Sequence, residues 1–319
     1  MNMRRSWTKR LLWAAFGAVI GYIFVSVVVA VPLAEMTLHI PRRPMVDRRL
    51  VQDAIDNLRA SIRDVQLVAR DGATLRAWYA EPQNGNGSAV VLLHGLGDNR
   101  AGVAGYAKLF LVHGYRVLLP DSRAHGESGG EIVTYGVLER DDVRRWTDWL
   151  KAQPGTGCVY GFGESMGAAL ILQSLAAHAP LCAVVAESAF STFREIAYDR
   201  ISSYAGLRPW FGRTFGRVPI ELSLLYTRWR YGVDLTQADP LRAIAESQVP
   251  VLLIHGASDT NISPRHSSML FNAAKSHAVL WIVPGAEHTG AWATAPALFE
   301  SDVLGWFNSH HALYSALRG

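Results

Sequence analysis

Cysteine is scarce in this chain of 319 residues, which contains only Cys158 and Cys182. One pair in a chain of this length excludes a small fold built on a disulfide framework, and no zinc-binding spacing is present. Each cysteine stands near the start of an apolar run typical of a strand. If those strands are neighbours, a disulfide would form in an oxidising compartment, but the prediction that we favour is two small buried thiols.

Clustered positive charge is lacking from most of the chain, although the formal net charge is +4. Residues 1–64 hold ten Lys and Arg against five Asp and Glu, whereas residues 65–319 hold 21 against 22. The main body has no stripe of basic residues interleaved with aromatics, which argues against nucleic-acid binding. Repeats and low-complexity segments are also missing, and 50% apolar content predicts a folded domain.

Charged residues are absent from Leu11 to Ala34, a stretch long enough to span a bilayer. We predict a single-pass transmembrane anchor over residues 11–34. The preceding basic residues place residues 1–10 in the cytoplasm and the main domain outside it; they are Arg4, Arg5, Lys9 and Arg10. The alternatives are a cleaved signal peptide, which would release a secreted domain, and a buried core helix.

Residues 35–63 are predicted to connect the anchor to the main domain. Two prolines, in Pro41-Arg42-Arg43-Pro44, break regular structure. From Asp47 to Arg63 apolar residues recur at helical spacing, which indicates a short amphipathic helix. Its arginine-rich face would rest on lipid head groups or face solvent.

From residue 64 to residue 319 strand and helix signals alternate. This pattern predicts an α/β fold, with a mostly parallel eight-stranded sheet and helices on both faces. Residues 65–68 and 75–79 form an opening hairpin around Asp71-Gly72. Six buried strands are expected at 89–93, 116–119, 158–161, 181–186, 249–254 and 279–283. The gap before the last two is too long for a simple crossover, so residues 190–247 are predicted to form a small helical cap.

The chemistry is predicted to start at Ser165 in Gly163-Glu164-Ser165-Met166-Gly167. This pattern follows an apolar run and opens a helical stretch, as in a sharp strand-to-helix turn that exposes a nucleophilic hydroxyl. The flanking glycines remove side chains that would clash there. A metal is not needed for this chemistry, and no cofactor is predicted.

A serine nucleophile needs a base, held in one tautomer by a carboxylate. Asp259 and His288 each follow one of the last two predicted strands, on the sheet edge where Ser165 emerges. We therefore predict Ser165 as nucleophile, His288 as base and Asp259 as acid. Glu187, which follows the preceding strand, is the rival acid.

The developing oxyanion also needs hydrogen-bond donors. The backbone N–H of Met166, directly after the nucleophile, is the first candidate. The second is the N–H of Leu96, because the glycines on either side of it let the backbone turn its amides inward. We expect His94 to brace this loop rather than to take part in chemistry.

Further segments resemble the α/β-hydrolase superfamily, over roughly residues 64–310. Asp121 to Ser128 is similar to the family's Asp-x-Arg-Gly-His-Gly-x-Ser segment, with Ala124 in place of the usual glycine. That segment is structural in relatives, so His125 is not carried over as catalytic. Residues 240–244 and 249–256 resemble the branch containing monoacylglycerol lipases, serine aminopeptidases and many membrane-anchored hydrolases. The resemblance implies a cofactor-free hydrolase that uses Ser165, Asp259 and His288.

These observations predict a serine hydrolase, of carboxylesterase or lipase type, acting through an acyl-enzyme on a carboxylic ester, lipid or thioester. An aminopeptidase-like enzyme acting on short peptides is the alternative. Such an enzyme would need carboxylates in the cap that bind the terminal amine of the substrate. The cap contains four candidates: Glu195, Asp199, Glu221 and Asp234. A membrane-anchored scaffold that has lost turnover is a third hypothesis.

Overall fold

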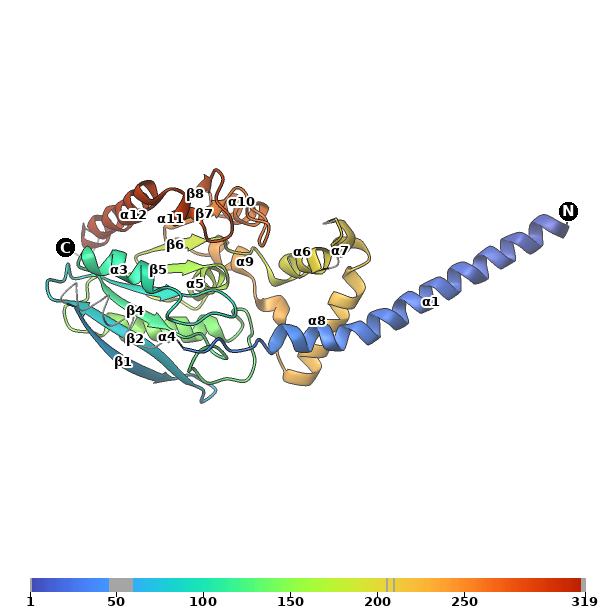
Figure 1. The fold of residues 1–319 in the computed structure, drawn as a ribbon, viewed down its shortest axis with the longest axis horizontal. Coiled ribbons are helices and arrows are strands. Elements are labelled where there is room, and N and C mark those ends of the chain that lie inside the picture. Colours follow the sequence, from blue (N-terminus) through green and yellow to red (C-terminus); the bar gives the residue numbers. More distant parts are fainter. Residues whose placement is uncertain (1, 46–59, 205, 209, 317–319) are drawn as a thin grey trace. The chain divides into compact units, whose positions relative to one another are not determined.

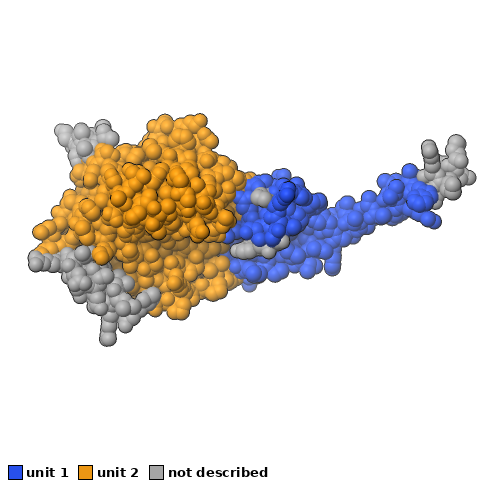
Figure 2. All heavy atoms as spheres, turned by 45° about the horizontal axis from the view of Figure 1, so that its top comes forward, with its two compact units in different colours: residues 1–38, 197–235 blue, residues 39–196, 236–319 orange. Residues whose placement is uncertain are grey.

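The computed structural model describes residues 2–45, 60–204, 206–208 and 210–316. The chain forms two compact units (Figure 2). The first, which we call the helical unit, combines residues 1–38 with 197–235. The second, the sheet unit, combines residues 39–196 with 236–319.

An eight-stranded sheet is the centre of the sheet unit (Figure 1). Its spatial order is β1-β2-β4-β3-β5-β6-β7-β8. Strand β2 pairs antiparallel with both β1 and β4, and all other pairs are parallel. The predicted α/β fold with a mostly parallel sheet is therefore confirmed. The strands are β1 (Ala60–Val68), β2 (Thr74–Pro82), β3 (Ala89–Leu93), β4 (Arg116–Pro120), β5 (Val159–Glu164), β6 (Ala183–Glu187), β7 (Val251–Gly256) and β8 (Ala278–Val283).

Helices cover both faces of the sheet because its inner strands are apolar on both sides. Every residue of β3 and β6 is buried. The helices of the sheet unit are α3 (Ala104–Val112), α4 (Glu139–Lys151), α5 (Met166–Ala176), α9 (Pro240–Ala245), α10 (Arg265–Ala273), α11 (Ala291–Thr294) and α12 (Pro296–Ala316). Helix α5 packs beside α4 and α9, and α3 and α12 share the core of the other face.

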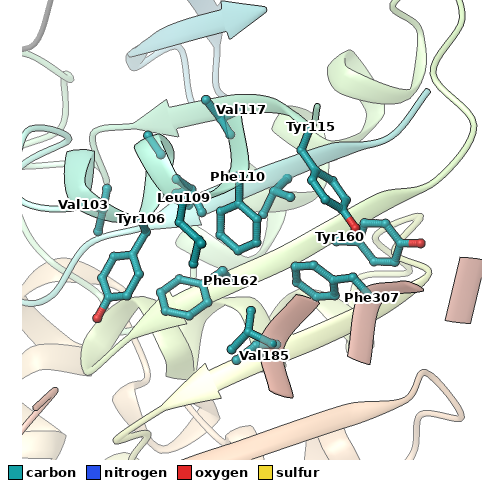
Figure 3. Close-up of a cluster of buried hydrophobic side chains, with 14 of the residues drawn as sticks. Val103, Tyr106, Leu109, Phe110, Tyr115, Val117, Tyr160, Phe162, Val185 and Phe307 are labelled. Atoms are coloured by element: carbon teal, nitrogen blue, oxygen red, sulfur yellow. The ribbon is translucent and has the colours of Figure 1, made fainter. Parts of the chain in front are cut away.

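Aromatic side chains fill the core between the sheet and helices α3 and α12 (Figure 3). Tyr160 of β5 stacks on Phe307 of α12 with ring centroids 4.4 Å apart. Phe162, also on β5, lies 4.4 Å from the ring of Tyr106 on α3. Burial of each such ring contributes about 2–3 kcal/mol. This packing fixes β5, the strand that ends one residue before Ser165.

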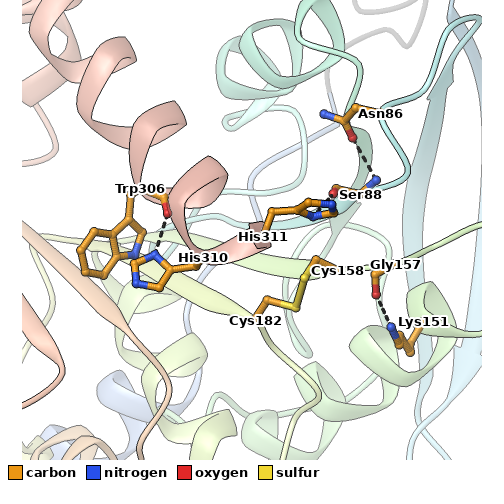
Figure 4. Close-up of a disulfide and its surroundings, with 9 residues drawn as sticks. All are labelled: Asn86, Ser88, Lys151, Gly157, Cys158, Cys182, Trp306, His310 and His311. Atoms are coloured by element: carbon orange, nitrogen blue, oxygen red, sulfur yellow. Dashed lines mark hydrogen bonds between the residues drawn. A yellow bond between two sulfur atoms is a disulfide. The ribbon is translucent and has the colours of Figure 1, made fainter. Parts of the chain in front are cut away.

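Cys158 and Cys182 form a disulfide, contrary to our prediction of two buried thiols (Figure 4). The two residues come immediately before β5 and β6, which are neighbouring parallel strands. Their Cα atoms are therefore only 5.8 Å apart, within the range that a disulfide requires. The sequence indicated both strand starts but not that the two strands are adjacent.

The N-terminal apolar segment is helical, as predicted, and α1 extends over Asn2–Leu38. A stretch from Trp7 to Leu38 is long and apolar enough to cross a membrane. The predicted connector differs in two respects. Its first residues, 35–38, continue α1, and its last, 60–63, belong to β1 rather than to a helix. The rest of the predicted amphipathic helix, residues 46–59, lies outside the described residues.

The long segment between β6 and β7 is helical. It contains α6 (Phe193–Tyr204), α7 (Trp210–Thr214), α8 (Arg217–Tyr231), the 3-10 helix Leu235–Gln237 and α9. Helix α8 packs along α1 within the helical unit. The assignment of residues 190–247 as a cap over a substrate site stays a prediction.

Candidate active site

Ser165 occupies the turn between β5 and α5. Its backbone combines a positive φ of 54° with ψ of −118°, a sparsely populated conformation that costs a non-glycine residue about 1–3 kcal/mol. Glycine is required on both sides, because a Cβ on Gly163 would lie 2.4 Å from the Gly167 carbonyl oxygen, and one on Gly167 would lie 2.2 Å from that of Leu93. The Ser165 N–H donates to the Glu187 carbonyl at 2.8 Å.

Three side chains from separate loops form one hydrogen-bonded chain. The Ser165 hydroxyl donates to Nε2 of His288 at 2.9 Å. The opposite ring nitrogen, Nδ1, donates to Oδ2 of Asp259 at 2.7 Å. Asp259 follows β7 and His288 follows β8, so the parallel strands bring both to the edge where β5 ends. The structure thus brings together the three residues predicted from the sequence.

Asp259 is a buried carboxylate, and both of its oxygens accept hydrogen bonds. Its Oδ1 accepts the N–H groups of Asn261 and Ile262 at 2.9 and 2.8 Å. His255 lies 3.2 Å from Oδ2. Burial acts to raise the pKa of Asp259, but the hydrogen bonds from His255, His288 and Ile262 outweigh it and hold the pKa well below the usual range. The carboxylate is therefore ionised at neutral pH and able to stabilise an imidazolium.

Glu187, the rival acid, has other partners. Its carboxylate accepts the Ala291 N–H at 3.0 Å and the Tyr106 hydroxyl at 3.2 Å. Both ring nitrogens of His288 are already taken by Asp259 and Ser165. The geometry therefore favours Asp259 over Glu187 as the partner of His288.

The loop after β3 runs beside the nucleophile. A Cβ on Gly95 would lie 3.4 Å from the Ser165 Cβ, so the backbone that leads into Leu96 approaches closely. Met166 is the first residue of α5, where N–H groups lack intrahelical acceptors. Met166 therefore adjoins Ser165, and the loop that carries Leu96 approaches it through Gly95; the role of the two N–H groups as oxyanion donors stays a prediction.

Two buried histidines brace this loop. Nε2 of His94 accepts the Ser122 N–H at 3.0 Å, while its Nδ1 bonds the Gly95 carbonyl at 2.8 Å. Nε2 of His125 accepts the Gly97 N–H at 3.1 Å. Burial lowers the pKa of His94 to about 4, so it is neutral and able to accept at physiological pH. Neither ring carries a hydrogen bond to Ser165.

The segment from Asp121 to Ser128 is held by buried ion pairs. Arg123 donates twice to Asp142, at 2.7 and 2.8 Å, and Arg100 donates to Asp121 at 2.6 Å. Ala124, which replaces the usual glycine, adopts a left-handed φ of 58°. That conformation explains why glycine is the natural choice at this position.

A cluster of two carboxyl groups and a phenol was missed by sequence reasoning. Glu164, inside the elbow motif, pairs in register with Glu187 on the neighbouring strand, and Tyr106 lies against both. Burial and the nearby Glu187 raise the pKa of Glu164 to about 7, although hydrogen bonds from Gly95 and Tyr106 oppose the shift. The only sequence signal was that both glutamates end apolar strands. Tyr106 gave none, because it comes from a helix.

No group of three or more His, Cys, Asp and Glu side chains suited to a metal ion occurs among the residues that the structure describes. The candidate site accordingly consists of the hydrogen-bonded chain from Ser165 to Asp259, with the loop at Leu96 beside it. That arrangement has the parts required for acyl transfer, namely a nucleophile, a base, a carboxylate and backbone amides.

Comparisons with known proteins agree with this architecture. The sequence model described as "Alpha/beta hydrolase family" matches residues 90–301. An uncharacterised protein of Mycobacterium tuberculosis is 30% identical over 229 residues, which cover 71% of this chain and 72% of that protein. The lysophosphatidylserine lipase ABHD12 of Mus musculus is 28% identical over 209 residues, 62% of this chain and 48% of the lipase. The Pyrococcus furiosus esterase Pf2001 superposes with a TM-score of 0.68 at 24% identity, covering 86% of this chain and 98% of the esterase.

Proposed function

The chain belongs to the alpha/beta hydrolase family, and we propose that it is a serine hydrolase that cleaves carboxylic esters through an acyl-enzyme. The observation that carries the proposal is the hydrogen-bonded chain from the Ser165 hydroxyl through His288 to Asp259. A serine hydroxyl becomes an effective nucleophile when a positioned imidazole takes its proton.

The cycle has two acyl-transfer steps. Ser165 Oγ attacks the substrate carbonyl carbon while Nε2 of His288 takes the hydroxyl proton. Asp259 keeps Nδ1 protonated and stabilises the imidazolium. The imidazolium then protonates the departing alcohol. Water, deprotonated by His288, attacks the acyl-enzyme and releases the acid and free Ser165.

The oxyanion of each tetrahedral intermediate is held by the N–H groups of Met166 and Leu96. Preorganised amides of this kind contribute about 3–4 kcal/mol each to transition-state stabilisation. Two observations support the assignment. Gly95 approaches Ser165 closely, and hydrogen bonds to His94 and His125 hold the backbone of this loop in place.

Ester cleavage is favoured over peptide cleavage because the cap carboxylates that an aminopeptidase would use to bind the substrate amine already have partners within the chain. Asp199 pairs with Arg213 at 2.7 Å, and Glu195 pairs with Arg265 at 2.9 Å. Glu221 accepts the Tyr198 hydroxyl at 2.7 Å. The fourth carboxylate, Asp234, has Arg228 at 3.7 Å, so a substrate amine would have to displace an existing partner at each of the four. The similarity to the lysophosphatidylserine lipase of Mus musculus, at 28% identity, supports the same choice.

Hydrolysis of p-nitrophenyl esters of increasing chain length, compared with aminoacyl anilides, tests this proposal on the full chain in detergent. We expect ester turnover that is lost in Ser165→Ala and no comparable anilide turnover. Preferential cleavage of anilides would favour the peptidase. Absence of any Ser165-dependent turnover in folded protein would favour the non-catalytic scaffold.

We also propose that α1 is a single transmembrane helix, with the N-terminus in the cytoplasm and the sheet unit outside it. The long apolar span, the basic residues before it and the disulfide, which persists in oxidising compartments, support this topology. A compartment-dependent reporter fused after residue 319 tests the orientation. Activity of a cytoplasm-specific reporter would overturn it.

A further inference from the structure

One face of α1 is built to pack against protein within the helical unit. Ser26, Ala30 and Ala34 follow one another at four-residue spacing and are 2–3% exposed, whereas most of the remaining apolar surface of α1 is open. Small residues at this spacing let helices approach closely in a membrane. The partner is α8, which runs along α1. Glu35 accepts hydrogen bonds from the hydroxyl groups of Tyr226 and Tyr231 at 2.7 Å.

If α1 spans the bilayer, the contact between α1 and the α7–α8 segment starts inside the hydrocarbon core. A hydrocarbon core of about 30 Å takes about 20 helical residues, which from Leu11 reach Ala30. The Tyr22 hydroxyl donates to the carbonyl of Phe215 at 2.8 Å, and the two rings meet edge to face. Tyr22 stands about 17 Å along the helix from Leu11. The α7–α8 end of the helical unit is thereby held beside the apolar part of α1.

The surface of α7 and α8 has the composition of a membrane interface. Large apolar side chains there are 46–81% exposed; they are Leu207, Trp210, Phe215, Leu225 and Trp229. Trp229, at 81%, stands between Arg228 and Arg230 near the end of α8 that binds Glu35. Residues 197–235 carry six arginines against three carboxylates. Tryptophan beside arginine is typical of the zone where acyl chains meet phosphates.

We propose that this surface, which runs from Leu207 through α7 and Phe215 to the end of α8, is a second membrane-binding element in the extracytoplasmic leaflet: Phe215 enters the acyl region beside Tyr22, and the end of α8 at Trp229 lies in the interfacial zone. Its occupant is a phospholipid bilayer containing anionic lipids. The apolar side chains enter the acyl region, and Arg228 and Arg230, which flank Trp229, extend to lipid phosphates. The inference rests on the proposed transmembrane course of α1, because continuity with that helix fixes the depth.

Depth-dependent quenching on the full chain in vesicles of phosphatidylcholine and phosphatidylglycerol tests the proposal. The two native cysteines are joined, so one introduced cysteine carries a fluorophore without competition. The variants are Phe215→Cys and Trp229→Cys. Phe24→Cys on the exposed face of α1 is the lipid reference, and Val112→Cys on the sheet unit is the aqueous reference.

We expect brominated lipid to quench the labels at positions 215 and 229 at least half as strongly as the label at position 24. Iodide, present on both sides of the bilayer, should quench them at least three-fold less than the label at 112. Lipid quenching at 24 combined with full iodide access at 215 and 229 would overturn the inference and leave the anchor intact. Iodide access at 24 would overturn both proposals. Protection of 215 and 229 from both quenchers would indicate protein contact and would also contradict the inference. Each labelled variant is also treated with a fluorophosphonate. Reaction at Ser165 shows, independently of the quenching measurements, that the variant is folded.

Discussion

At the scale of single residues, a serine hydroxyl is a weak nucleophile at neutral pH, and the proposed function requires the groups around Ser165 to activate it. His288 lies 2.9 Å from the hydroxyl, and a carboxylate kept ionised by its own donors lies behind the ring. Two acidic residues were candidates for that carboxylate: Asp259, which follows β7, and Glu187, which ends the adjacent strand β6. Variants of the two separate their roles.

Asp259→Asn is expected to lower kcat for ester hydrolysis about 10³–10⁴-fold, because an amide no longer holds His288 in the required tautomer. Glu187→Gln is the matched control. The Gln oxygen still accepts the Ala291 N–H, and its NH2 group donates to the Tyr106 hydroxyl oxygen, so we expect a change of less than about ten-fold. Initial rates with a p-nitrophenyl ester measure both. Equal losses in the two variants would contradict the assignment.

Glu164 predicts a dependence of stability on pH. Burial raises its pKa from the ordinary 4.5 to about 7 in the folded chain, so the folded state binds this proton more tightly. The resulting stabilisation is complete below about pH 4.5 and is lost as the pH rises through about 7. Relative to Glu164→Gln, the free energy of unfolding of the wild type should fall by about 3 kcal/mol between pH 4 and pH 8. Denaturant titrations from pH 4 to pH 8 measure it.

The exposed Glu131→Gln serves as the control for that experiment and should keep the pH dependence of the wild type. Parallel curves for the wild type and Glu164→Gln would show that the Glu164 carboxyl is not perturbed. Sequence reasoning could not anticipate this shift, because it comes from burial of the Glu164 carboxyl and from Glu187, which is distant along the chain and comes close only when β5 pairs with β6.

At the scale of elements, the elbow between β5 and α5 depends on glycine. Gly163→Ala places a Cβ 2.4 Å from a backbone oxygen, so either the turn or the strand must shift. We expect a loss of more than about 3 kcal/mol in stability, or loss of the folded state. Gly305→Ala on α12 is the control, since its Cβ meets nothing within 4 Å, and it should stabilise by about 0.5–1 kcal/mol. Thermal unfolding of both variants tests this, and similar melting temperatures would contradict it.

The disulfide joins the starts of β5 and β6 across 24 residues of chain. Closing a loop of this length stabilises by about 3 kcal/mol in the chain-entropy description. The double variant Cys158→Ser/Cys182→Ser should therefore unfold about 6–12 °C below the wild type. Dithiothreitol should lower the melting temperature of the wild type and leave that of the variant unchanged. A melting temperature of the variant equal to that of the wild type would contradict a stabilising role.

The elements differ in how far the sequence foretold them. Strands β3 to β8 were recovered to within a few residues, because buried parallel strands appear as short continuous apolar runs. The start of β1 was not, and residues 60–63 were assigned to a helix. Their conformation is set by pairing with β2, where Ala60 lies opposite Pro82. The spacing of apolar residues within this segment does not indicate that pairing.

At the scale of the whole molecule, charge and apolar content divide the chain into parts with different surroundings. The basic N-terminus and the apolar helix that follows predict a membrane anchor, while the nearly neutral remainder predicts a folded domain. What composition could not predict is that residues 197–235 associate with α1 in one unit. That association depends on small residues on one face of α1 and on Tyr22, Tyr226 and Tyr231, which act only once the helices are side by side.

The central claim is that Ser165 is an activated nucleophile, and covalent modification tests it most directly. The full chain is incubated with a fluorophosphonate, digested, and searched by mass spectrometry for the modified peptide. We predict stoichiometric phosphonylation at Ser165, absence of labelling in Ser165→Ala, and labelling slowed at least 100-fold in folded His288→Ala. Folded wild-type protein that stays unmodified, or that reacts at another serine, would contradict the account.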